Sequence, residues 1–92
     1  MADRPYRVRL TPSARDALSS LPIGAQRRVV RSMESLESNP RPRGATLLEG
    51  STDRRIWRVR VGDYRVLYEI RDAELVVLVI RIGHRREVYR GR

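Results

Sequence analysis

The segment 55–70, RIWRVRVGDYRVLYEI, constrains the fold most strongly, because a Gly-Asp pair separates two runs in which apolar and charged residues alternate. A pair of this kind between alternating runs is typical of a β-hairpin with a tight turn. Alternation along a strand sends successive side chains to opposite faces of a sheet. The segment therefore predicts a hairpin that carries Arg58, Arg60 and Arg65 together on one face.

The other face of this hairpin is predicted to be apolar and to lie against helices. Its residues are Trp57, Val59 and Val61 in the first strand and Tyr64, Val66, Tyr68 and Ile70 in the second. An antiparallel sheet can leave its second face in water. We therefore expect the arginines on a face that no helix covers.

The N-terminal half of the chain is predicted to be largely helical. Thr11 followed by Pro12 indicates a helix start, with the threonine as the cap and the proline at the first helical position. This helix is expected to end near Ser20, and an apolar stripe predicts a second helix over 24–38. The stripe consists of Val29, Val30, Met33 and Leu36.

The predicted strands cover 6–10, 55–61, 64–70 and 74–82, and the connector 45–53 is expected to form a short turn or strand. The element order is then β-α-α-β-β-β. We expect an α+β fold in which residues 1–92 form a single small domain, with two helices packed on one face of an antiparallel sheet. The last strand is apolar on both sides, as a central strand requires, and Arg81 lies near its end, opposite Ile80 and Ile82.

The charge of the chain indicates a polyanionic partner. The 92 residues include 20 basic and 11 acidic ones, and the formal net charge is +9. A folded domain with such a charge is typical of proteins that bind nucleic acid. All the basic residues are arginine, which a coding bias explains well enough, so only the positions of individual arginines support a functional argument.

Several classes of protein are not expected. The absence of cysteine excludes disulfides and thiolate zinc sites. The apolar run 75–80 is far shorter than the ~20 residues that a membrane span needs, and the N-terminus lacks an apolar leader. A chain of this length has no room for a large pocket enclosing a substrate and a cofactor. We expect a cytoplasmic protein, without metal or cofactor, that acts through an exposed face.

Two titratable side chains follow the apolar part of the last strand. His84 comes directly after Gly83, and Tyr89 lies five residues further on. Both are predicted to edge the face that carries the arginines, where they could transfer protons or contact a base. A packing role is the alternative for each of them.

The segments WRVRVGDYRVLYEI and VVLVIRIGHRREVYR, with the N-terminal YRVRLTPSARDALSSLP, resemble the RelE/ParE superfamily of toxins from type II bacterial toxin–antitoxin modules, and its RelE branch most. The resemblance covers nearly the whole chain. It implies the compact α+β fold and, for the RelE branch, a metal-independent endoribonuclease that cleaves mRNA in the ribosomal A site. The implied partners are a cognate antitoxin protein, the ribosome and mRNA, with no membrane and no small-molecule substrate.

The resemblance also implies roles for individual residues. The family's basic pair before the turn matches Arg58 and Arg60, and the arginine after the turn matches Arg65. The basic residue after the glycine of the last strand matches Arg85, and the C-terminal tyrosine matches Tyr89. We expect Arg65 and Arg85 to bind the scissile phosphate, while Arg58 and Arg60 either assist them or hold flanking phosphates.

The implied reaction is attack of a ribose 2′-OH on the adjacent phosphorus, which leaves a 2′,3′-cyclic phosphate. Arginine is a poor proton acceptor, so proton transfer is assigned to His84 or Tyr89 without a choice between them. Some relatives use a glutamate before the hairpin, but Glu49 does not align with it. Arg81 matches no family role, and we group it with the phosphate-binding residues.

Two other functions stay open. The ParE branch of the same superfamily poisons DNA gyrase and is not a nuclease, and similarity of fold does not separate the branches. A relative that binds RNA without cleaving it is the third possibility. The tail GHRREVYR, with its tyrosine, favours the RelE branch.

Overall fold

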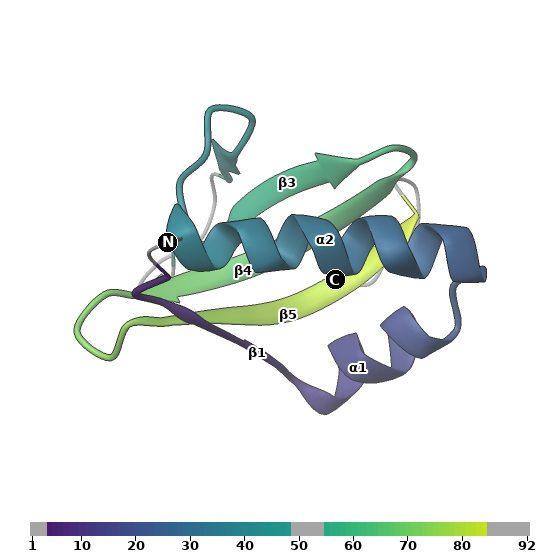
Figure 1. Cartoon of the computed structure of the whole chain (residues 1–92), viewed down its shortest axis with the longest axis horizontal. Helices are drawn as coiled ribbons and strands as arrows, with labels where there is room; N and C mark the ends of the chain where they lie inside the picture. The colour runs from purple at the N-terminus through teal and green to yellow at the C-terminus, as the bar shows by residue number, and fades with distance from the viewer. Residues whose placement is uncertain (1–3, 49–54, 85–92) are drawn as a thin grey trace.

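The computed structural model describes residues 4–48 and 55–84. Two helices and five strands follow one another along this part of the chain (Figure 1). They are β1 (Arg7–Leu10), α1 (Pro12–Ser19), α2 (Ile23–Ser38), β2 (Thr46–Leu47), β3 (Trp57–Val61), β4 (Tyr64–Arg71) and β5 (Val76–His84). The predicted α+β fold and element order are confirmed, and the connector after α2 adds the short strand β2.

The predicted local signals set the ends of several elements. The Thr11 hydroxyl accepts a hydrogen bond from the Ala14 backbone N–H at 3.1 Å and so caps α1, which begins at Pro12. Gly62 has a φ of +60° in the turn between β3 and β4, a conformation that glycine adopts without steric cost. Leu75 has a φ of +56° and closes the next turn, so β5 begins at Val76 and not at 74 as predicted.

The sheet has the strand order β1-β5-β4-β3-β2. β3, β4 and β5 form the predicted antiparallel meander, and β2 pairs antiparallel with β3. β1 runs parallel to β5, with Arg7 opposite Val76 and Leu10 opposite Val79. The prediction of an antiparallel sheet is therefore wrong at β1, and the sheet is mixed. Alternation within a strand predicts which side chains share a face, but it carries no information about the direction of the neighbouring strand.

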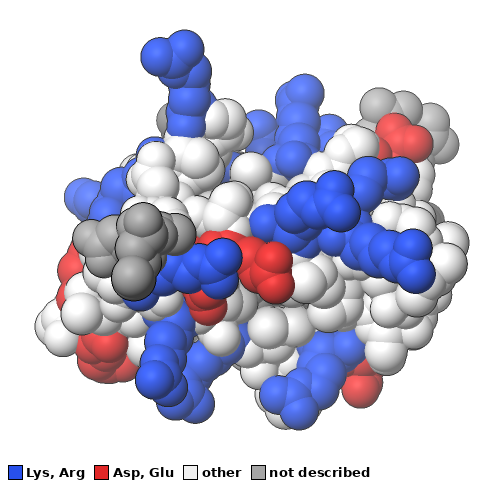
Figure 2. Space-filling view, in the orientation of Figure 1, with Lys and Arg blue, Asp and Glu red and all other residues white. Residues whose placement is uncertain are grey.

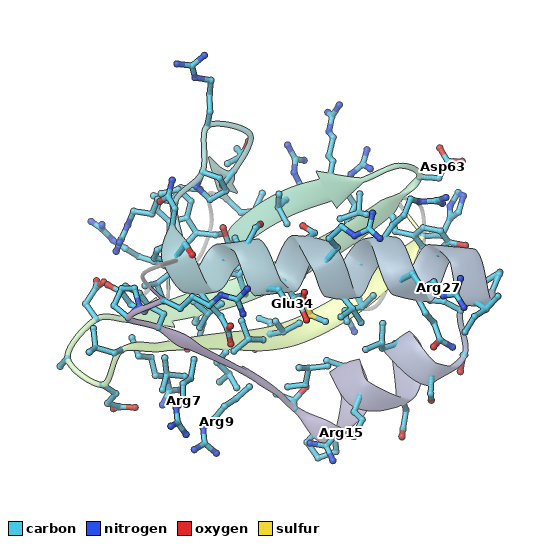
Figure 3. The ribbon with its side chains drawn as sticks, viewed as in Figure 1. Arg7, Arg9, Arg15, Arg27, Glu34 and Asp63 are labelled. Carbon is cyan, nitrogen blue, oxygen red and sulfur yellow. The ribbon has the colours of Figure 1, made fainter. Side chains whose placement is uncertain are left out.

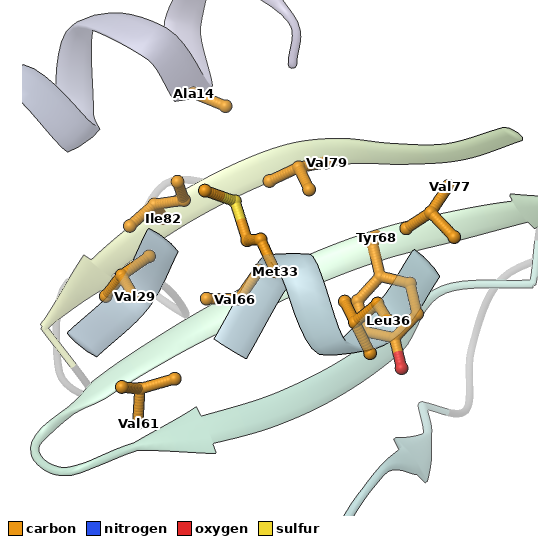
Figure 4. Close-up of a cluster of buried hydrophobic side chains, with 10 residues drawn as sticks. All are labelled: Ala14, Val29, Met33, Leu36, Val61, Val66, Tyr68, Val77, Val79 and Ile82. Carbon is orange, nitrogen blue, oxygen red and sulfur yellow. The ribbon is translucent and has the colours of Figure 1, made fainter. Parts of the chain in front are cut away.

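Both helices lie on one face of the sheet, as predicted (Figure 1). Ala14 of α1 and Val29, Met33 and Leu36 of α2 are buried against this face (Figure 4). The strands contribute Val61, Val66, Tyr68, Val77, Val79 and Ile82 to the same core. The predicted stripe of α2 is wrong at Val30, which is 37% exposed, because consecutive helical residues lie about 100° apart around the axis. No helix in the described ranges is long and apolar enough to cross a membrane.

Candidate functional site

The face of the sheet opposite the helices collects arginines from four strands. Residues that are directly opposite each other in neighbouring strands share a face, so the register assigns each side chain to one side of the sheet. In the pairs that define this side, Arg60 is opposite Arg65, and Leu67 lies between Arg58 and Arg81. We call this surface the arginine face, and its arginines are Arg7, Arg9, Arg58, Arg60, Arg65, Arg71 and Arg81.

The prediction that Arg58, Arg60 and Arg65 share a face is confirmed by this register. Arg60 is exposed and Arg58 is half-buried. Arg60 is directly opposite Arg65 and Arg58 is opposite Leu67, two residues further along β4, so three guanidinium groups start from neighbouring points of the hairpin. Fixed guanidinium groups in such an arrangement are suited to bind phosphate oxygens, often with two hydrogen bonds each.

A β-bulge brings Arg81 to the same face. The register between β4 and β5 shifts after Leu67, so that Val79 is opposite Tyr68 while Arg81 is opposite Leu67. Ile80 is the extra residue of β5. Strict alternation would place Arg81 on the side of Val79, under the helices, and the bulge turns it to the arginine face instead. Bulges commonly redirect a side chain in this way near functional sites.

Arg65 differs from the other arginines of this face because it is buried. Only 8% of its surface is exposed, and its Nη1 donates to the Tyr64 carbonyl oxygen at 3.4 Å. No residue of the described chain accepts a hydrogen bond from its buried Nε. A buried donor without an acceptor costs about 1–3 kcal/mol.

Glu69 is the one carboxylate that the register places on the arginine face of the described strands. It is 8% exposed, and its Oε1 accepts a hydrogen bond from Arg71 at 3.3 Å. A single acid therefore stands against seven arginines on this surface. The surplus of positive charge on the described part of the face remains large.

Arg7, Arg9 and Arg71 belong to this face but were not among the predicted site residues. Arg7 and Arg9 alternate with Val8 and Leu10, which lie on the helix side. Figure 3 shows both arginines on the side of β1 that faces away from α2. The alternation RVRL was visible in the sequence, but the parallel position of β1 beside β5 was not.

His84 lies on the other side of the sheet. It is directly opposite Tyr64, and the two rings make an edge-on contact with centroids 5.9 Å apart. Tyr64 shares its face with Val66 and Tyr68, which are buried under the helices. Gly83 is the residue opposite Arg65. The prediction that His84 edges the arginine face is therefore wrong, and its predicted role in proton transfer has no support from this register.

The surface on the helix side has a different electrostatic character. Figure 2 shows acidic side chains interspersed among the arginines there. Arg41 binds Asp72 at 2.8 Å and lies 5.7 Å from the centre of the Trp57 ring. The Arg41 guanidinium, with the Tyr6 hydroxyl, holds the pKa of Asp72 below its usual value. On this side Arg41 and Arg4 form ion pairs with Asp72 and Glu37 of the protein itself.

Three residues considered in the sequence analysis, Arg85, Tyr89 and Glu49, lie outside the described residues. Within the described ranges, no group of three His, Asp or Glu side chains is placed to hold a metal ion. The arrangement observed there is a broad basic surface centred on one buried arginine. Its chemistry is that of anion binding.

Comparison with known proteins places the chain in a family. The family model described as ParE toxin of type II toxin-antitoxin system, parDE, matches residues 8–89. The chain is 36% identical over 90 residues to Toxin RelG of Mycobacterium tuberculosis (strain ATCC 25618 / H37Rv), and the alignment covers 94% of this chain and 98% of the relative.

Solved structures agree with this result. The toxin of the archaeal RelE-RelB complex from Pyrococcus horikoshii OT3 is 34% identical, with a TM-score of 0.77 over 88% of this chain and 96% of that chain. The toxin–antitoxin complex RelBE2 of Mycobacterium tuberculosis matches at 32% identity, with a TM-score of 0.75 over 87% and 98% of the two chains. The fold, the extent of the family match and these relatives together mean that the chain belongs to the RelE/ParE superfamily of toxins of type II toxin–antitoxin systems.

Proposed function

We propose that this toxin is a ribosome-dependent endoribonuclease that cleaves mRNA and so inhibits translation. The observation that carries the proposal is the arginine face, where six other arginines surround the position of Arg65 and Glu69 is the one carboxylate of the described strands. An RNA backbone would neutralise this surplus of positive charge. The similarity to RelG and to RelE toxins supports the same assignment.

The proposed reaction joins the ribose 2′-oxygen to the adjacent phosphorus and breaks the bond from phosphorus to the 5′-oxygen of the next nucleotide. The products are a 2′,3′-cyclic phosphate and a free 5′-hydroxyl. Negative charge grows on the non-bridging oxygens in the transition state, and Arg65 with Arg85 stabilises it. Arg58, Arg60 and Arg81 hold flanking phosphates. The guanidinium groups supply this positive charge, so the proposed mechanism uses no metal ion.

The 2′-hydroxyl must lose a proton and the leaving oxygen must gain one. His84 and Tyr89 are the candidates proposed for these transfers. The register turns His84 toward Tyr64 on the helix side. We therefore propose that Tyr89 contributes more than His84 to the cleavage rate through proton transfer.

A toxin with this face needs a partner that covers it. The similar proteins from Pyrococcus horikoshii and Mycobacterium tuberculosis are complexes of a toxin with its antitoxin. We propose that a cognate antitoxin, rich in acidic residues along the segment that contacts the arginine face, neutralises this toxin. Its co-expression should abolish both the growth arrest and the mRNA cleavage.

Brief induction of the toxin in cells, followed by primer extension, tests the proposed activity. One template is a translated mRNA, and the control is the same mRNA without its start codon. We expect new 5′ ends on the translated message alone, and a fall in their yield of about 10²–10³-fold when Arg65→Met replaces the parent. Cuts on both messages would remove the ribosome from the proposal.

The match to the ParE toxin model favours gyrase inhibition as the second candidate. The same cultures separate the two functions. A gyrase poison would break chromosomal DNA and relax a reporter plasmid while both messages stay intact. A protein that only binds RNA would leave the DNA and the messages intact and still show salt-dependent RNA affinity.

A further inference from the structure

Arg7 and Arg9 form a group of their own on the arginine face. Both are exposed and project from β1, at the opposite edge of the sheet from β2. Arg9 is in register with Leu78 and Glu69, and Arg7 with Val76 and Arg71. Among the described residues, neither has a carboxylate within ion-pair distance. No role follows for them from the proposed cleavage site.

Their position differs from that of ordinary surface arginines. Arg27 and Arg31 on α2 are also exposed, but Glu34 lies one turn from Arg31 on the same surface. Acids and bases at such a spacing stabilise a helix. Arg7 and Arg9 have no such neighbour on β1, and they repel each other across one intervening residue. A bound polyanion would remove this repulsion.

The distance from the cleavage site favours separate phosphates for the two groups. With about 3.4 Å per residue along a strand and about 4.8 Å between strands, the Cα atom of Arg9 lies about 17 Å from that of Arg65. Consecutive phosphates of a stacked strand are about 3.4 Å apart along its axis. The two arginine groups can therefore hold different phosphates of one RNA strand. Arg81, about 8 Å from Arg9 by the same estimate, lies between them.

We propose that Arg7 and Arg9 are a second phosphate-binding group, which holds the backbone of single-stranded RNA several nucleotides from the cleaved bond. The inference rests on the proposed function and extends it across the sheet. The group contacts phosphates and not base edges, so it raises affinity without adding sequence preference. It strengthens binding of substrate and transition state alike, and its loss should raise KM more than it lowers kcat.

Salt dependence of RNA binding tests this group directly. The probe is a single-stranded RNA oligonucleotide with 2′-O-methyl riboses, which cannot be cleaved through the 2′-hydroxyl. The Arg7→Gln/Arg9→Gln variant is compared with the parent and with Arg27→Gln/Arg31→Gln, which removes the same charge from α2. Each phosphate contact contributes about 0.7 to the slope of log affinity against log salt for single strands.

We expect the Arg7→Gln/Arg9→Gln variant to lose about 1.4 from this slope and to bind about 25-fold more weakly at 0.1 M salt than the parent. The α2 variant should keep the parent slope. Equal losses in both variants would mean that only overall charge matters, and an unchanged slope in the β1 variant would also overturn the inference. The inference would also be overturned if the protein bound a poly-glutamate peptide more tightly than RNA and the β1 variant bound RNA as well as the parent does.

The two proposals fail separately in this design. If the parent cleaves translated mRNA but the β1 variant keeps the parent slope, the nuclease stands and the second binding group is wrong. If the parent cleaves nothing but the β1 variant loses the expected slope, the binding group stands without the nuclease. A parent that neither binds RNA nor cleaves mRNA overturns both.

Discussion

The two faces of the sheet are built from the same strands but differ in how their buried polar atoms are hydrogen-bonded. On the helix side Tyr68 is fully buried, and its hydroxyl donates to the Pro40 carbonyl oxygen at 2.8 Å. On the arginine face Arg65 is almost as deeply buried, yet its Nε meets no acceptor in the described chain. The buried hydroxyl of Tyr68 is hydrogen-bonded on the helix side, whereas the buried Nε of Arg65 on the other face is not. We infer from this difference that the helix side serves stability, and we propose that the arginine face serves binding.

The largest expected effect is on the helix side. Leu36→Ala removes a fully buried side chain that packs α2 on the sheet, and such a truncation destabilises by about 2–5 kcal/mol. For a chain of this size, each kcal/mol lowers Tm by about 4–8 °C, so we expect a fall of at least about 8 °C by calorimetry. Cleavage should persist at temperatures where the variant is folded. Lost cleavage with an unchanged Tm would contradict the division of roles between the faces.

The opposite result is expected for Arg65→Met, which keeps much of the aliphatic stem and removes the charge. Loss of a group that stabilises a transition-state oxyanion typically lowers the rate by about 10²–10³-fold, and mRNA cleavage should fall by this amount. Stability should stay the same or rise, because a buried donor without an acceptor is removed. Primer extension and calorimetry on one preparation measure both. A large fall in Tm would show that Arg65 is a structural residue.

Much of this comparison could be predicted from local sequence. The alternation in 55–70 was enough to separate Arg58, Arg60 and Arg65 from the apolar residues of the hairpin, because a strand period of two is a local property. The Thr11 cap of α1 and the turn at Gly62 were local in the same sense. All of these features needed only residues near each other in the chain.

The parts that could not be predicted depend on pairing between distant segments. The place of β1 beside β5 brings Arg7 and Arg9 to the arginine face, and no local pattern encodes that partner. The bulge after Leu67 reverses the face of Arg81 relative to strict alternation. Register also turned His84 to the side of Tyr64. In each case the missing information was which strand lies beside which, or how the two strands are aligned. Both depend on the whole sheet.

The position of His84 allows a test of which face of the sheet carries the proton transfer. If proton transfer takes place on the arginine face, His84→Ala should lower the cleavage rate less than tenfold, because its ring contacts Tyr64 on the other side. Tyr89→Phe should lower it by at least about 100-fold, the lower end of the usual contribution of a general acid or base. Single-turnover cleavage on programmed ribosomes measures both. Parent rates in both variants would refute the proton-transfer assignment, and a larger loss for His84→Ala would place the reaction at the end of the sheet.

The smallest effect concerns the satisfied hydroxyl of Tyr68. Tyr68→Phe removes its hydrogen bond to Pro40, and we expect a loss of about 1 kcal/mol. Burial raises the pKa of Tyr68 to about 12, above the usual value of about 10. The folded protein therefore holds this proton more tightly than the unfolded chain, so the contribution is complete below about pH 10 and is lost as the pH rises toward 12. Denaturant unfolding between about pH 10 and 12 should show that the free energy of unfolding falls with pH in the parent and falls less in Tyr68→Phe. If the two proteins lose stability identically at alkaline pH, the hydrogen bond of the Tyr68 hydroxyl adds nothing to the free energy of unfolding. The two faces would then differ only in their charge.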